Sequence, residues 1–391
     1  MTWGRGKVIK TMAGLFALSL TIRPMIAQTQ YEWVPGSRQA RPVSPGYPQG
    51  QIYQPGSGQT QYYQSGQRAP AQSYQYRTVP RPAAQSETPN SRSQSYHYMD
   101  SVTVDGMARQ FQVHIPASYD RSKATPVVLV FHGLHMNGTM MVGMTGFNGL
   151  SERKGFIVVY GEAAAGRWSD GRTASGVDDI AYVGALLDRL GKVANIDRRR
   201  IYACGISNGG YFSQVLACAI PDKIAAVGSV GSTLMEQTTG TMQSGKPVPI
   251  VFFLGTEDPL IPWGDGRVKD LGKLGEILGL SSLGSIDNSM VRMGGLLNVQ
   301  ETIAFWTAHN HASTTPYVSQ EADRDPKDGT RVKKEEYGSG NNAVVLYTIE
   351  GGGHTWPGCI NLKAISGISG NISQDISASE LLWDFFRNRS L

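Results

Sequence analysis

The sequence predicts an α/β domain with a mostly parallel sheet and helices on both of its faces, preceded by an N-terminal segment without a core. From about Met99 to the C-terminus, short apolar runs alternate with longer segments of helical periodicity. Such alternation is typical of a parallel sheet whose crossovers are helices. Residues 28–97 consist mainly of Gln, Tyr, Pro, Ser and Gly, and no hydrophobic period is found there. We therefore expect three parts, at 1–27, 28–97 and 98–391.

Residues 1–27 have the features of an export signal, with a basic start, an apolar stretch at 12–22 and a small residue, Ala27, suited to cleavage. The apolar stretch is too short to span a bilayer comfortably, so we expect no stable membrane span after signal removal. Residues 23–25 make a poor cleavage context, and an uncleaved N-terminal anchor is the alternative. In both cases the domain leaves the cytoplasm, and we expect a secreted or periplasmic protein.

The residues at 28–97 are interpreted as a disordered linker, because they cannot bury enough apolar surface to offset the entropy of ordering. An adhesive contact with a cell envelope or a polymer is the functional alternative. Charge is unevenly distributed: residues 1–97 hold 10 Lys and Arg against 2 Asp and Glu, whereas 98–391 hold 26 against 29. A slightly acidic domain argues against nucleic acid as a partner.

The expected elements follow one another along the domain. A hairpin at 101–115 turns at Asp105-Gly106, as a tight two-residue loop does. The helix at 178–193 starts with an acidic first turn and has apolar residues at three- and four-residue spacing. Further strands are expected at 126–131, 156–160, 200–205, 223–230, 249–255 and 342–350, and further helices at 208–220, 299–310 and 377–389.

The strongest chemical signal is the motif Gly205-Ile206-Ser207-Asn208-Gly209, which fits G-x-S-x-G between an expected strand and an expected helix. A serine on such a turn adopts a strained backbone, and the flanking glycines let the strand and the helix approach closely. The serine also lies at a helix N-terminus, where free N–H groups face a developing oxyanion. We predict that Ser207 is a nucleophile and that the Asn208 N–H is one oxyanion donor.

A serine nucleophile needs a base and an acid that orients this base, and with this motif both follow the serine along the chain. Three histidines follow Ser207. His309 and His311 lie at the end of an expected helix, where histidines commonly cap carbonyl groups. His354 directly follows a strand, in the glycine-rich sequence EGGGHTWPG, and is predicted to be the base.

The acid is expected just after the strand at 249–255. Glu257 and Asp258 both lie there, in PIVFFLGTEDP. We predict Asp258, because the shorter acid of an Asp-Pro turn is commonly placed to orient a neighbouring group. Glu257 is the alternative, and Asp265 is a more remote one.

The second oxyanion donor is expected in the loop after the strand at 126–131, which reads His132-Gly133-Leu134-His135. The N–H of Leu134 or of His135 would complete the hole. Both histidines are interpreted as structural residues that shape the loop. No metal role is expected, since no acidic residue or cysteine joins them at ligand spacing.

Three tryptophans fall in loops that are expected at the same edge of the sheet: Trp168, Trp263 and Trp356. We predict that they line an aromatic substrate cleft. The alternative is that they are buried in loop packing.

Only three cysteines occur, Cys204, Cys218 and Cys359, and they cannot form a disulfide framework. Cys204 lies in an apolar run and is expected to be a buried free thiol. A bridge between Cys218 and Cys359 stays open in an oxidising compartment.

The motifs together resemble a family, the exported esterases grouped with polyhydroxyalkanoate (PHB) depolymerases and feruloyl esterases, over roughly 98–391. The resemblance rests on His132-Gly133 after a strand, on the Trp168 loop followed by VDDIAYVGALLD, and on RIYACGISNGGYFSQVLAC, LGTEDPLIPW, VQETIAFWTAHN, GGGHTWPG and ISASELLWDFF. It implies an α/β-hydrolase fold, a triad of Ser207, Asp258 and His354, no cofactor, and an ester substrate, small or polymeric. Members of the family cleave quite different esters, so the resemblance implies the chemistry without the substrate.

One stretch departs from the family pattern. The Gly/Leu/Met-rich sequence within 263–299 is longer and more apolar than the pattern leads us to expect. It is interpreted as a lid or an acyl-binding cap, with a surface loop as the alternative. No separate polymer-binding module is evident, which weakens the case for a dedicated depolymerase.

The sequence as a whole predicts an exported serine esterase that works through an acyl-enzyme intermediate. A serine peptidase on the same triad is one alternative, which a comparison of matched ester and amide substrates separates. An envelope-associated binding protein is the other, and it predicts that deletion of 28–97 abolishes surface attachment.

Overall fold

The computed structural model describes residues 31–32, 41–42, 94–164, 166–169, 177–239, 245–261, 263, 296–359 and 370–391. The chain divides into two units, 1–72 and 73–391. In the first unit, β1 (Tyr31–Glu32) pairs with β2 (Arg41–Pro42) in antiparallel fashion. The signal segment and most of the predicted linker lie outside the described residues.

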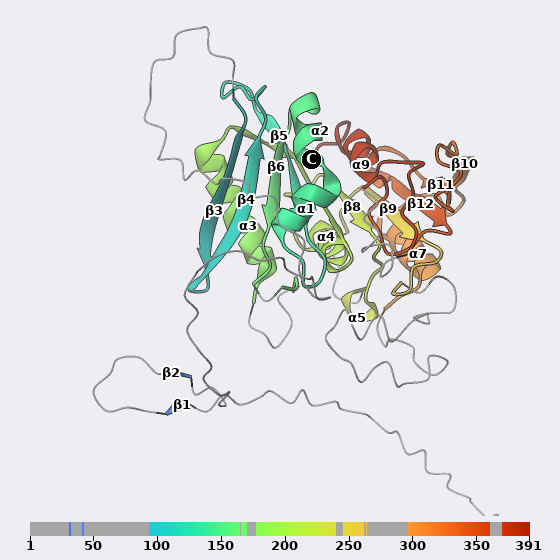
Figure 1. Ribbon diagram of the computed structural model, residues 1–391, viewed down its shortest axis with the longest axis horizontal. Helices are drawn as coiled ribbons and strands as arrows, with labels where there is room; N and C mark the ends of the chain where they lie inside the picture. The colour runs from blue at the N-terminus through green and yellow to red at the C-terminus, as the bar shows by residue number, and fades with distance from the viewer. Residues whose placement is uncertain are drawn as a thin grey trace, which may run out of the picture. The chain divides into compact units, whose positions relative to one another are not determined.

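The second unit is built on a sheet of ten described strands, in the order β10-β11-β12-β9-β8-β7-β5-β6-β4-β3 (Figure 1). The strands are β3 (Tyr96–Val104), β4 (Met107–Ile115), β5 (Thr125–Phe131), β6 (Ile157–Gly161), β7 (Ile196–Ile206), β8 (Ala226–Val230), β9 (Ile250–Gly255), β10 (Tyr317–Gln320), β11 (Arg331–Tyr337) and β12 (Val344–Glu350). The six central strands run parallel, and hairpins at the two edges run antiparallel. This confirms the predicted mostly parallel sheet of the α/β-hydrolase fold.

Helices cover both faces of this sheet, because successive residues of each buried strand point to opposite sides. The described helices are α1 (Gly138–Thr145), α2 (Phe147–Lys154), α3 (Asp179–Val193), α4 (Asn208–Ala219), α5 (Glu236–Thr239), α7 (Val299–His309), α9 (Ala378–Phe386) and the 3-10 helix η3 (Gly340–Asn342). On β5, Val127 and Leu129 pack with α3, α4 and α7, whereas Val128 and Val130 pack with α1, α2 and α9. The fold thus has one core on each side of the sheet.

Every strand and helix expected from the sequence is present, with shifted ends. β7 begins four residues earlier than expected, and β3 begins at Tyr96, inside the predicted linker, because Tyr96 pairs with Ile115 at the end of the hairpin. Sequence patterns missed α1 and α2, which have eight residues each, and the largely polar strands β10 and β11. Val332 on β11 is the only buried side chain of these two strands, so no apolar alternation in the sequence indicates them.

All three cysteines, Cys204, Cys218 and Cys359, are buried free thiols, and the bridge left open between the last two is not formed. Burial raises the pKa of Cys218 to about 12. None of the described helices combines the length and the apolar character that a bilayer crossing requires.

Candidate active site

Ser207 lies on the sharp turn between β7 and α4. Its φ of 55° and ψ of −122° are rare for a residue with a side chain, and its N–H donates to the Val230 carbonyl over 2.8 Å. The turn passes so close to β5 that a Cβ on Gly205 or Gly209 would lie 2.4 or 2.1 Å from the Phe131 carbonyl oxygen. Both glycines of the motif are therefore required by backbone contact.

His354 and Asp258 form a hydrogen-bonded pair at the carboxyl ends of β12 and β9. The Nδ1 of His354 lies 2.8 Å from the Oδ2 of Asp258, whose side chain is 1% exposed. The other oxygen of Asp258 accepts the N–H groups of Leu260 and Ile261, over 2.8 and 3.1 Å. These bonds hold the carboxylate in one orientation toward the imidazole.

The protonation of the pair follows from its chemistry. A carboxylate can only accept, so Nδ1 of His354 carries the proton and Nε2 has the lone pair that a general base needs. Burial acts to lower the pKa of His354, but the negative charge of Asp258 and its hydrogen bond outweigh this effect. The pKa of His354 is therefore raised above its ordinary value of 6.5.

A shared turn after β8 brings the pair to the side of Ser207. Gly231 follows Val230, which binds the Ser207 N–H, and a Cβ on Gly231 would lie 3.1 Å from the Nδ1 of His354. The strands β7, β8, β9 and β12 are parallel neighbours in the sheet. Ser207, Asp258 and His354 therefore all lie at the carboxyl ends of these strands.

The alternative residues named from the sequence lie elsewhere or outside the described chain. Glu257 is exposed, and it is Asp258 that contacts His354. Asp265 lies outside the described residues. His309 ends α7 with its Nδ1 3.0 Å from the Oδ1 of Asn310.

The loop after β5 lies directly against Ser207. A Cβ on Gly133 would be 3.5 Å from the Cβ of Ser207. His135 is exposed, with a φ of 57°, and its N–H donates to the Gly166 carbonyl over 2.9 Å. This bond occupies the N–H of His135. Of the two candidates named from the sequence, the N–H of Leu134 therefore remains as the second oxyanion donor.

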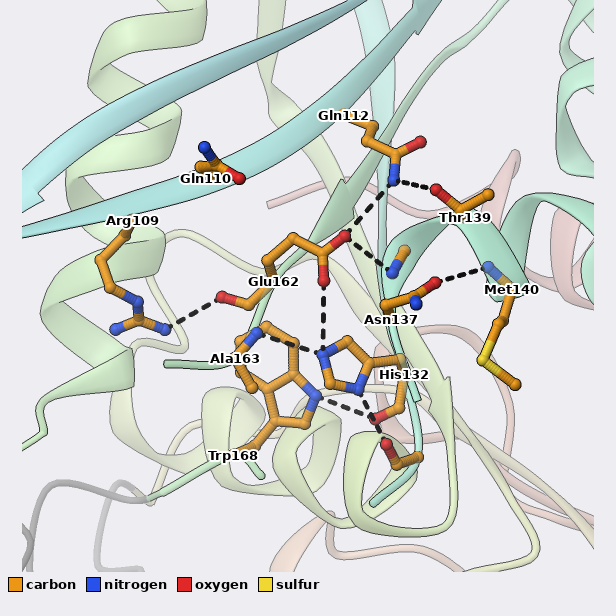
Figure 2. Close-up of polar contacts among 12 residues, drawn as sticks. Arg109, Gln110, Gln112, His132, Asn137, Thr139, Met140, Glu162, Ala163 and Trp168 are labelled. Atoms are coloured by element: carbon orange, nitrogen blue, oxygen red, sulfur yellow. Dashed lines mark hydrogen bonds and ion pairs between the residues drawn. The ribbon is translucent and has the colours of Figure 1, made fainter. Parts of the chain in front are cut away.

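His132 is a buried histidine with both ring nitrogens bound to backbone (Figure 2). Its Nδ1 lies 2.8 Å from the Gly133 carbonyl, and its Nε2 accepts the Ala163 N–H over 3.1 Å. Burial lowers the pKa of His132, although the Gly133 carbonyl and the Glu162 carboxylate act in the opposite direction. The ring is therefore neutral and shapes the loop, as expected from the sequence.

Two of the three tryptophans predicted to line a cleft belong to the core, and for them the prediction is wrong. Trp168 and Trp356 are each 1% exposed. The Trp168 ring stacks on Phe212, and the Nε1 of Trp356 donates to Ser379. Trp263 is partly buried against the core. Most of the predicted lid within 263–299 lies outside the described residues.

A polar cluster beside the site has no chemical role that sequence patterns indicate. The Asn208 side chain accepts the Trp168 N–H over 2.6 Å, and Arg109 pairs with Asp179 in the interior. The sequence around Asp179 indicates only an acidic first helical turn, and nothing in the local pattern of Arg109 indicates burial. In the part of the chain that the structure describes, no three His, Cys, Asp or Glu side chains gather as metal ligands.

Comparison with known proteins confirms the resemblance drawn from the motifs. Residues 111–244 match the family model described as Esterase PHB depolymerase. A Nocardia uniformis subsp. tsuyamanensis protein named "Putative esterase NocK" is 28% identical over 269 residues, which cover 66% of this chain and 73% of that protein. Feruloyl esterase B of Piromyces equi is 24% identical over 63% of this chain and 42% of its own length. The acetyl xylan esterase structure from Aspergillus awamori covers 69% of this chain and 98% of its own, with 16% identity and a TM-score of 0.45.

Proposed function

We propose that the chain is an exported serine esterase acting through an acyl-enzyme, and the match of residues 111–244 to the family model described as Esterase PHB depolymerase supports the proposal. The observation that carries the proposal is the 2.8 Å contact between His354 and Asp258 at the sheet edge where Ser207 occupies its strained turn. Export is proposed from the signal-like residues 1–27.

The proposed reaction begins with attack of the Ser207 hydroxyl oxygen on the ester carbonyl, while Nε2 of His354 takes the hydroxyl proton. Asp258 holds the imidazole in the required tautomer and stabilises the imidazolium. The N–H groups of Asn208 and Leu134 bind the oxyanion. His354 then protonates the leaving alcohol. In the second step Nε2 of His354 takes a proton from water, the water oxygen attacks the acyl carbonyl, and the carboxylic acid product leaves as His354 returns the proton to the Ser207 oxygen.

The proposed substrates are carboxylic esters of the polyhydroxyalkanoate or feruloyl type. The description of the matching family supports the first, and the name of the Piromyces equi relative supports the second. The chain spans less than half of that relative, so the substrate is part of the proposal.

The test is the hydrolysis rate of the purified full chain beside its Ser207→Ala variant. The substrates are short-chain p-nitrophenyl esters, methyl ferulate, a suspended polyhydroxybutyrate film and an amide matched to the best ester. We expect serine-dependent ester turnover, with kcat reduced by more than about 10³-fold in the variant.

Ser151→Ala is the matched control, because Ser151 is buried on α2 and its hydroxyl binds only the local Phe156 carbonyl. This variant should keep wild-type turnover. Retention of most ester hydrolysis by Ser207→Ala would refute the mechanism, and faster turnover of the amide would make the chain a peptidase.

A further inference from the structure

A buried ion pair beside the site holds two ends of one chain segment. Arg109 on β4 and Asp179 at the start of α3 are 3% and 0% exposed, and they pair with each other. Arg109 also donates to the Glu162 carbonyl over 3.2 Å, and Asp179 accepts the Ser169 N–H over 2.6 Å. We call residues 162–164 and 166–169 the bridging segment, and the ion pair holds its first and last residues.

The bridging segment contacts both sources of the proposed oxyanion donors. On one side, the Gly166 carbonyl accepts the His135 N–H over 2.9 Å, and the Nε1 of Trp168 donates to the His132 carbonyl over 2.9 Å. On the other side, the Trp168 N–H donates to the Oδ1 of Asn208 over 2.6 Å. These bonds set the spacing between the loop after β5 and the start of α4.

The first residues of the bridging segment hold the loop after β5 at both of its ends (Figure 2). The Glu162 carboxylate accepts the Gly138 N–H over 2.9 Å, where α1 begins. The Ala163 N–H donates to Nε2 of His132, where β5 ends. Any displacement of the bridging segment would therefore be transmitted to the Leu134 N–H between these two anchors.

We propose that Arg109 and Asp179 are positioning residues for the oxyanion hole, acting through the bridging segment; this inference rests on the proposed esterase function. Oxyanion donors act because they are fixed before the charge develops, and displacements of about 0.5 Å weaken them. A buried ion pair commonly adds little to stability compared with apolar residues of similar volume, yet it fixes geometry through directional bonds. Arg109 and Asp179 hold the Glu162 carbonyl and the Ser169 N–H, one at each end of the bridging segment.

The test variant is Asp179→Asn, which keeps the shape of the side chain and removes the charge that holds Arg109. We expect kcat on the best ester to fall about 10–100-fold while KM stays within about threefold, because the lost contacts act on the transition state. The affinity for phenylboronic acid, which forms a tetrahedral adduct with serine, should fall in parallel with kcat. The acid limb of the pH–rate profile should not move, since His354 and Asp258 are unchanged.

Asn310→Ala is the control for stability alone. Asn310 is fully buried and holds Val248 at the amino end of β9, the opposite end from the site. It should lower the Tm without a parallel loss of kcat or of boronate affinity. Equal kcat and boronate affinity in wild type and Asp179→Asn would overturn the proposal, as would equal losses in Asn310→Ala.

Trp168→Phe keeps the proposal testable if Asp179→Asn does not fold. It retains an aromatic ring against Phe212 and removes the Nε1–H that binds the His132 carbonyl, together with one ring of the indole. We expect kcat to fall about 3- to 10-fold with boronate affinity following, and an unchanged kcat would overturn the proposal. Absence of ester turnover in the wild type would instead refute the proposed function, which separates the two failures.

Discussion

Two histidines approach carboxylates at the same edge of the sheet, and their surroundings differ. His354 follows β12 and places Nδ1 2.8 Å from Asp258, whereas His132 follows β5 and keeps Nε2 3.8 Å from Glu162. The pKa of His354 is raised and that of His132 is lowered. Proximity to a carboxylate therefore does not by itself set the direction in which the pKa of a histidine shifts.

The hydrogen-bond partners of the ring nitrogens distinguish the two histidines. Backbone groups bind both nitrogens of His132, so its ring has no lone pair to offer a substrate. Asp258 binds Nδ1 of His354 and thereby assigns the lone pair to Nε2. One histidine stiffens a loop, and the other is equipped to move a proton.

The largest expected effect separates the two histidines by activity. His354→Gln should reduce kcat by more than about 10³-fold, because Ser207 would lose the base that takes its hydroxyl proton. His132→Gln should keep kcat within about tenfold and lower the Tm, since it disturbs buried hydrogen bonds worth about 1–3 kcal/mol. Steady-state kinetics and thermal unfolding of both variants provide the measurement, and equal losses of kcat would contradict the distinction.

The two carboxylates should differ in the same way, with a large loss of kcat on substitution of Asp258 and a small one on substitution of Glu162. Asp258→Asn should lower kcat by about 10³–10⁴-fold, because an amide can donate to Nδ1 and so favours the wrong tautomer. Glu162→Gln should keep kcat within about tenfold of the wild-type value, since the side-chain amide oxygen of Gln can still accept the Gly138 N–H. Both variants are compared by kcat at the pH optimum, and a Glu162→Gln loss as large as that of Asp258→Asn would show that Glu162 has a part in the chemistry.

The pH dependence of activity sharpens the comparison further. Since the pKa of His354 is raised, kcat/KM of the wild type should fall as the pH drops through a value above 6.5. In Asp258→Asn, the remaining activity should have its acid limb at lower pH, because burial then acts without the opposing charge. An acid limb at the same pH in both proteins would assign the titration to another group.

The smallest expected effect is on the pH dependence of stability, to which the two histidines contribute with opposite signs. The raised pKa of His354 contributes stability below about pH 6.5 that is lost as the pH rises through its folded pKa. The lowered pKa of His132 favours the unfolded chain as the pH falls below about 6.5. Between pH 8 and pH 5, the Tm should therefore fall less in His132→Gln than in wild type and more in His354→Gln, by roughly 2–4 °C. Parallel Tm curves in all three proteins would exclude both shifts.

Local patterns were enough to predict the elbow and the chain order of the site. The motif around Ser207 requires glycine at two close contacts with β5, and this requirement is visible in the sequence as G-x-S-x-G. The position of His354 after a strand, within a glycine-rich turn, predicts it to be the base, and apolar periodicity locates the central strands and most of the long helices. These features depend on neighbouring residues, so the sequence by itself determined them.

Only the tertiary structure decided which side chains meet. Sheet order places β9 beside β12 and so brings the turn after β9 to His354, where the side chain of Asp258, the acid preferred from the sequence, makes the contact. Packing between helices and strands buries Trp168 and Trp356, which the sequence alone assigned to a cleft. The pairing of Arg109 with Asp179, 70 residues apart, has no local signature. Contacts between distant segments depend on the order of strands and on side-chain directions, and neither is written in the local period of a chain.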